Sequence, residues 1–459
     1  MAKDAQLTDR DVRITELERK LTEVTQLVIS LRDQLGRNSR NSHLPPSSDG
    51  PGARPSGGSS PVGARKRGGQ PGHGGNKREL LPPDEVDAIV ELYPKACENC
   101  WLALPRVRSD EATRYQVTEL PPIRPHTTEY RCNAVTCTCG YTTVAKAEGV
   151  VPTSPFGPRL MALIALLTGV YHLSRRRSVT LLRDVLGVRI SLGALSSVEG
   201  RVGAALEPVV QEVWSKVDDA AVKHADATSW LLSGKLRSLW TIATKAVTVF
   251  KILVDGSSAS VKPIFGACRG ILVSDRATVF CFWTMSLRQI CWAHLLRKFV
   301  SFSERDGPAR SIGNELLDYT VLIFDYWHDL QAGKIDRRTF RAWLAPVRLR
   351  VEECLARAVA ATVKDVSGAC ADILEHKEAL WTFVERDEVE PTNNHAEREL
   401  RAFVLWRKKS FGAQSERGNL FAERIMTVAH TARKQDKNVF AFLTECLGGT
   451  GSPSLFAAP

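Results

Sequence analysis

The sequence lacks any apolar run long enough to cross a bilayer. Its longest such stretch covers residues 160–173, falls short of a membrane span and contains Thr168, Gly169 and His172. The N-terminus also lacks an apolar segment behind a basic flank, so we expect neither a signal peptide nor a membrane partner. These absences favour a cytoplasmic protein.

The chain also lacks a disulfide pattern among its cysteines and has fewer acidic than basic residues. The eleven cysteines do not form a disulfide framework, because five crowd between Cys97 and Cys139 while the other six are scattered singly. Against 62 Lys and Arg the chain has 51 Asp and Glu, for a net charge of +11. That balance suits a polyanionic partner such as DNA, although net charge says nothing about fold.

A heptad pattern opens the chain. Aliphatic residues recur every seven positions, and a second set lies three places behind the first: Leu7, Ile14, Leu21, Val28 and Leu35, then Leu17, Val24 and Leu31. This a/d seam predicts a coiled coil over residues 1–37 and therefore a homodimer or higher oligomer. The alternative is an amphipathic helix that packs on its own domain.

Residues 38–80 are rich in Asn, Ser, Pro and Gly and show no apolar period, which predicts a flexible basic linker. Within it, Arg65, Lys66 and Arg67 could contact DNA phosphates. A solvated run of charge is the competing interpretation.

A cysteine-rich segment follows over residues 81–150. It contains a CxxC pair and then a second, irregular cluster on a stretch rich in Thr, Tyr and Val. Paired thiolates on two facing turns give Zn²⁺ tetrahedral ligation, so we predict a zinc-ribbon-like DNA-binding module. The expected ligands are Cys97, Cys100, Cys132 and Cys139, with Cys137 as the alternative. Reduced structural thiols would be the simpler explanation.

Residues 151–215 have a helical pattern. Ser178 and Ser191 are placed to cap two successive helices, which predicts a helix-turn-helix-like DNA-binding region. Arg175 and Arg176 precede the first helix as candidate DNA contacts. An ordinary αα-hairpin explains the pattern equally well.

From residue 216 the pattern becomes that of strands. Strands are expected at 222–230, 239–243, 247–254, 270–275 and near Gln289, with a Ser-Gly turn at Ser233 between the first two. Three antiparallel strands followed by two that helices separate is the order of a ribonuclease H-like sheet. We therefore expect a catalytic core in two parts, 216–300 and 389–437, around a helical insertion at 301–388, with a C-terminal tail at 438–459.

Three carboxylates fall in the positions that such a sheet uses for metal ions. Asp226 lies in the first strand, Asp275 ends the fourth, and Glu397 lies on a late helix. Oxygen ligands of this kind suit Mg²⁺, and two such ions can stabilise both the attacking and the leaving oxygen of a phosphoryl transfer. The competing interpretation makes Glu397 the partner of Asn394 in a capping box. Replacing Glu399, which lies on another face of the same helix, by Gln is expected to leave activity within a few-fold.

The sequence resembles the large transposase of the insertion sequence 66 family, in the DDE class of bacterial mobile elements. The motifs that carry the resemblance run through most of the chain: Asn38 to Asp49, Gly68 to His73, the cysteine module, Leu167 to Ser174, Asp226, Val273 to Asp275, Cys291-Trp-Ala-His294 and Asn393 to Arg398. The chain departs from the family in having Ala227 after the first Asp and Arg276 after the second.

The resemblance implies Asp226, Asp275 and Glu397 as a catalytic triad with Mg²⁺ or Mn²⁺. It further implies element ends and target DNA as substrates, small accessory proteins of the same element as partners, and a nucleoid location in a bacterium. Four cations near the last carboxylate become candidate phosphate contacts: Arg398, Arg401, Lys408 and Lys409. We therefore predict a multidomain α+β transposase. The alternative is a zinc-dependent DNA-binding or regulatory protein with an inactive ribonuclease H-like domain.

Overall fold

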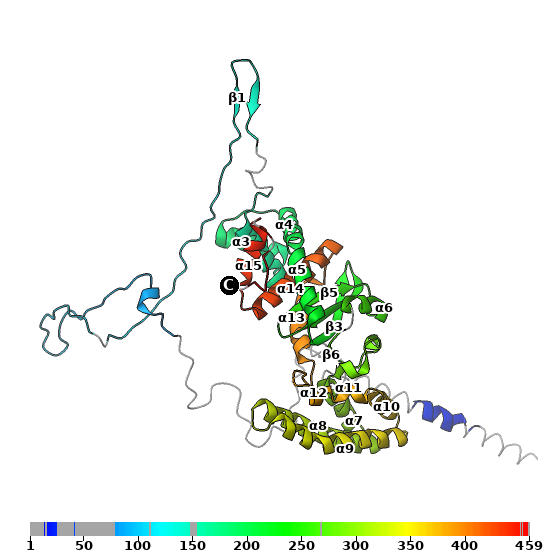
Figure 1. Ribbon diagram of the computed structural model, residues 1–459. Helices are drawn as coiled ribbons and strands as arrows, with labels where there is room; N and C mark the ends of the chain where they lie inside the picture. The colour runs from blue at the N-terminus through cyan, green and yellow to red at the C-terminus, as the bar shows by residue number, and fades with distance from the viewer. Residues whose placement is uncertain are drawn as a thin grey trace, which may run out of the picture. The chain divides into compact units, whose positions relative to one another are not determined.

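Figure 1 shows the computed structural model, which describes residues 13, 16–24, 41, 79–109, 112–146, 154–266, 269–449, 451 and 453–457. The chain divides into two compact units. One contains Met1–Pro51, Thr128–Asp184 and Val188–Pro459, and the other Gly52–Thr127 and Val185–Gly187. Across the described ranges, no helix is both long and apolar enough to cross a membrane.

The predicted coiled coil and basic linker fall mostly outside the described residues. Residues 16–24 are helical, and their predicted seam positions Leu17, Leu21 and Val24 are 60%, 68% and 57% exposed. The smaller unit contains a 3₁₀ turn, η2 (Pro83–Glu85), and little other regular structure among its described residues.

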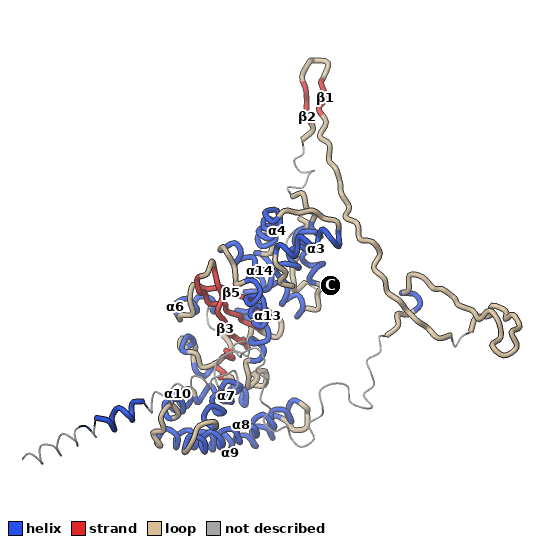
Figure 2. The backbone as a smooth tube through the Cα atoms, turned by 180° about the vertical axis from the view of Figure 1, so that it is seen from behind, coloured by secondary structure: helices blue, strands red, loops and turns tan. Residues whose placement is uncertain are grey.

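A five-stranded mixed sheet forms the centre of the larger unit (Figure 2). Its strands, in spatial order, are β5 (Thr248–Leu253), β4 (Lys235–Ala243), β3 (Val222–Leu232), β6 (Ile271–Ser274) and β7 (Arg288–Ile290). The first three pair antiparallel, and β6 and β7 run parallel to β3. The β3–β4 hairpin turns through Ser233 and Gly234, both at positive φ, as the predicted Ser-Gly turn requires. The predicted mixed α+β class is confirmed.

Short elements connect the strands. Helix α6 (Ser258–Val261) and the 3₁₀ turn η4 (Lys262–Phe265) join β5 to β6, and the turns η5 (Thr278–Phe280) and η6 (Met285–Leu287) join β6 to β7. A separate two-stranded hairpin, β1 (Ala134–Thr136) with β2 (Thr142–Val144), precedes the helical region.

The helical region before the sheet contains α2 (Pro158–Ala165), the π-helical turn η3 (Leu166–Val170), α3 (Arg175–Leu186), α4 (Leu192–Ala205) and α5 (Glu207–Asp219). Ser191 caps α4, as predicted, by accepting a hydrogen bond from the Ala194 N–H at 3.1 Å. The predicted cap at Ser178 is wrong. Helix α3 begins three residues earlier, so Ser178 lies buried inside it.

After β7 the chain forms a helical body. It consists of α7 (Trp292–Ser303), α8 (Pro308–Gln331), α9 (Arg337–Ala360), α10 (Ser367–Glu375), α11 (Lys377–Leu380) and α12 (Thr382–Glu385). Its core is aromatic: the Trp292 and Trp381 rings lie 5.0 Å apart, and Trp381 stacks on Phe383. The chain then returns to the sheet as α13 (Asn394–Ser410), α14 (Glu416–Lys434) and α15 (Val439–Leu447).

A buried charge cluster joins α13 to α14. Glu399 accepts a hydrogen bond from the His430 ring and lies 3.2 Å from the Lys434 Nζ. The Lys434 Nζ also lies 2.8 Å from the His395 Nε2. Glu399 therefore has a structural role, because its carboxylate contacts Lys434 and His430 in the interface that positions α13. The expected effect of Glu399→Gln on activity stays a prediction.

Replacing Glu399 by Gln should destabilise the protein at pH 7 by about 3 kcal/mol, because Lys434 would lose its buried counter-charge and the His430 ring its carboxylate acceptor. Burial opposes ionisation of Glu399, but His430 and Lys434 outweigh it and lower its pKa from 4.5 to about 2. A depressed pKa stabilises the folded state above pH 4.5, and this contribution is lost as pH falls towards 2. Denaturant titrations of both proteins should therefore converge between these pH values; a constant difference would contradict the assignment.

Gly412 should resist substitution more strongly than other turn glycines. It follows α13 at φ +87°, and an added Cβ would lie 2.0 Å from the Leu231 carbonyl oxygen. Gly412→Ala should therefore cost at least about 3 kcal/mol in unfolding free energy. Gly234→Ala is the matched control, since Gly234 has φ +78° but open space around it; it should cost about 1 kcal/mol. Equal losses in thermal unfolding would exclude the steric explanation.

Candidate active site

Strand register brings Asp226 and Asp275 to the same level of the sheet. In the parallel β3–β6 pair, His224 lies opposite Val273, so Asp226 and Asp275 each follow two residues later on neighbouring strands. Side chains two residues apart share a face, which places both carboxylates at the carboxyl end of β6. Such an edge of a parallel pair is where ligands usually bind in sheets with this connection.

Asp226 is held in an unfavourable electrostatic environment. Burial, together with the negative charges of Glu397 and Asp275, raises its pKa to about 7, although the Ala227 N–H, which donates to Oδ1 at 2.8 Å, partly compensates. The three predicted carboxylates therefore interact across the site. A divalent cation would relieve their repulsion, so the donor set fits the hard metal ions expected here.

Asp275 is fixed through its backbone and its neighbours. Its Oδ1 accepts the Ala277 N–H at 3.0 Å, and the buried Arg288 donates to its carbonyl oxygen at 3.1 Å. Arg276, which departs from the family pattern, turns away to form an ion pair with Asp372 on α10. The Arg276 side chain therefore contacts the helical body.

Glu397 lies in the first turn of α13. The capping-box interpretation is wrong, because Asn394 is already helical and Asn393 occupies the cap position without a side-chain capping bond. Instead, the Glu397 carboxylate lies 3.6 Å from the His294 Nδ1 and 3.4 Å from the Arg297 Nη2, both on α7. The Glu397 carboxylate therefore lies beside an imidazole and a guanidinium group.

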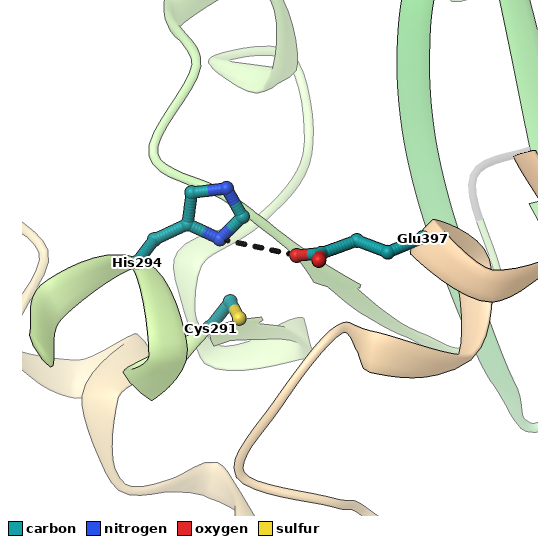
Figure 3. A group of neighbouring side chains, drawn as sticks. All are labelled: Cys291, His294 and Glu397. Carbon is teal, nitrogen blue, oxygen red and sulfur yellow. Dashed lines mark ion pairs between the residues drawn. The ribbon is translucent and has the colours of Figure 1, made fainter. Parts of the chain in front are cut away.

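Cys291, His294 and Glu397 form a close group (Figure 3). One ligand atom from each lies within 4.8 Å of the others, while among the described residues no such group includes Asp226 or Asp275. Cys291 and His294 come from the start of α7, and Figure 3 shows the imidazole and the carboxylate pointing towards each other. Sequence patterns predicted no site role for Cys291, His294 or Arg297. A Cys and a His three residues apart at a helix start could have identified the first two.

The candidate DNA-contacting cations differ in their surroundings. Arg175 forms an ion pair with the buried Glu199 at 2.5 Å, which gives it a structural role. Arg65, Lys66 and Arg67 lie outside the described residues. The others are exposed: Arg176, Arg398, Arg401, Lys408 and Lys409.

The candidate zinc ligands divide between the two units, so the four-cysteine site stays a prediction. Cys97 opens a tight turn in which the N–H groups of Cys100 and Asn99 bond its sulfur and lower its pKa. Cys137 opens a similar turn between β1 and β2, where the Cys139 N–H lowers its pKa. Cys132 precedes β1 and is exposed.

Comparison with known proteins places this chain in a family. A family model described as Transposase IS66 family matches residues 153–420, which contain Asp226, Asp275 and Glu397. A second model, for a family of unknown function (DUF6444), matches residues 2–79. No curated protein matches the sequence. Because the first model covers more than half of the sequence, the chain belongs to the transposase IS66 family.

Proposed function

We propose that the protein binds the ends of an insertion element and catalyses metal-dependent DNA strand cleavage and strand transfer, with Asp226, Asp275 and Glu397 as the catalytic triad. The observation that carries the proposal is the strand register that brings Asp226 level with Asp275, just beyond the carboxyl end of β6. Burial, and then the charges of Glu397 and Asp275, raise the pKa of Asp226. A perturbed acidic group among other carboxylates is typical of a site that handles cations.

The sheet supports a ribonuclease H-like assignment. Its spatial order, β5-β4-β3-β6-β7, combines three antiparallel strands with two parallel ones. A ribonuclease H-like sheet delivers its acidic residues from the central strand, the next parallel strand and a later helix. Asp226 on β3, Asp275 after β6 and Glu397 on α13 occupy those places.

Mg²⁺ or Mn²⁺ ions held by the three carboxylates would activate water or a DNA 3′-hydroxyl and stabilise the leaving oxygen. The protein's own groups prepare this site. The Ala277 N–H orients Asp275, while His294 and Arg297 hold Glu397 until the ligands assemble. Arg297, as a cation beside the carboxylates, also limits the charge that a metal must neutralise.

A cationic face on α13 is suited to the DNA backbone. Arg398, Arg401 and Lys408 recur at helical spacing and are exposed, so they line one side of the helix that carries Glu397. DNA bound along this face would have its phosphates close to the carboxylates. The zinc module and the N-terminal coiled coil would add end recognition and dimerisation, since pairing two ends requires two protomers.

Asp226→Asn, Asp275→Asn and Glu397→Gln should each abolish Mg²⁺- or Mn²⁺-dependent cleavage and joining of element ends. An amide keeps the size of the side chain but lacks the charge that binds a divalent cation. Sequence-specific binding of end DNA, measured by gel shift at fixed salt, should persist in all three variants. Mn²⁺ should raise the melting temperature of the wild type and not that of the variants.

Matched controls are Asp219→Asn and Glu445→Gln, which remove exposed carboxylates from α5 and α15. Both should retain cleavage within a few-fold of the wild type. Strand transfer near the wild-type rate by Glu397→Gln would remove Glu397 from the triad.

Without metal, Asp226→Asn should also stabilise the protein. At pH 8 the wild-type carboxylate is charged although burial, Glu397 and Asp275 all oppose its ionisation, whereas an amide carries no such penalty. The expected gain is about 1–2 kcal/mol in denaturant unfolding with a chelator present. A loss of stability would mean that Asp226 has a structural role.

A further inference from the structure

Cys291 lies at the N-terminal end of α7, where backbone donors surround its sulfur. It is fully buried at the cap of α7, and its sulfur accepts the Asn393 N–H at 3.1 Å. The N–H groups of His294 and Ala293, in the first turn of α7, also point at the sulfur. Backbone donors around a sulfur and a helix N-terminus both favour negative charge there.

The sulfur is closed to solvent, and ligand atoms of His294 and Glu397 lie beside it. A metal ion that binds sulfur strongly would replace the thiol proton, forming a metal–sulfur bond and releasing one proton to solvent. The geometry therefore suits a thiophilic cation.

The other two ligand atoms complete the set. The His294 Nδ1 lies 3.6 Å from a Glu397 carboxylate oxygen, and all three ligand atoms lie within 4.8 Å of each other. Sulfur, imidazole nitrogen and carboxylate oxygen are the ligands that Zn²⁺ takes in proteins, whereas Mg²⁺ avoids sulfur. Glu397 is 31% exposed, so its side of the group is open to an entering ion and to a water as fourth ligand.

We propose that Cys291, His294 and Glu397 form a zinc-class metal site that competes with the acidic site for Glu397. An ion in this site would hold the Glu397 carboxylate against α7 and away from Asp226 and Asp275. Arg297, 3.4 Å from the same carboxylate, would have to move aside. Filling the site would therefore inhibit strand cleavage, a consequence that rests on the proposed function.

Metal binding itself can be measured on the full-length protein with Co²⁺, whose thiolate complexes absorb in the near ultraviolet. Wild type should bind one more equivalent of Co²⁺ than Cys291→Ser or His294→Asn, since any cysteine-module site is common to all three. Cys446→Ser, which removes a half-buried cysteine on α15, is the control and should behave as wild type. Equal stoichiometry and spectra in wild type and both site variants would overturn the proposal.

Inhibition by zinc is tested by measuring the rate of end-DNA cleavage at saturating Mg²⁺ over a series of added Zn²⁺ concentrations. The same series is run for the wild type and each variant. The zinc concentration that halves the rate should rise at least about tenfold in Cys291→Ser and in His294→Asn. If the variants are inhibited at the same zinc concentration as the wild type, zinc acts elsewhere and the inhibitory role is overturned. If no protein cleaves DNA, the proposed function fails while the Co²⁺ result still decides the metal site.

Discussion

The position of Glu397 depends on one buried amide, the side chain of Asn393. It is 1% exposed and donates to the Ala225 carbonyl on β3 at 2.8 Å, while its backbone N–H donates to the Cys291 sulfur. Two residues earlier, the Pro391 carbonyl accepts the Trp292 N–H at 2.9 Å. The chain leaves the sheet at α7 and returns only after α12. These hydrogen bonds offset the entropic cost of closing so long a connection, and they fix where α13 begins beside the sheet.

At the β5 edge of the sheet, the residue spacing of helix α14 matches that of the strand. Strand β5 is an edge, and its outward N–H groups at Thr248, Phe250 and Ile252 donate to side chains of α14. The acceptors, Thr431, Thr427 and Glu423, lie four residues apart. Four helical residues rise about 6 Å and two strand residues about 6.6 Å, so helix and strand stay in step. Edge pairing with another chain is thereby blocked, and α14 is fixed beside α13.

Sequence patterns predicted the elements whose signals are local. The Ser-Gly turn, the apolar run before Asp275 and the cap at Ser191 each act within a few residues, and the structure contains all three. Contacts between distant segments were not predictable in the same way. The partners of Glu399 lie on another helix, so the sequence reveals none of them. The sequence around Glu397 fits a capping box, although the Asn393 amide donates to β3 instead.

Electrostatics explain why Glu397 rests against α7. Near the two aspartates it would add a third negative charge to a partly buried site, and the raised pKa of Asp226 already reflects that repulsion. Near α7 it meets Arg297 and His294 instead. Without cations the α7 position is therefore the favourable one. Under the proposed metal chemistry, cations beside the aspartates would oppose this preference, because they would replace the repulsion felt by the Glu397 carboxylate with attraction.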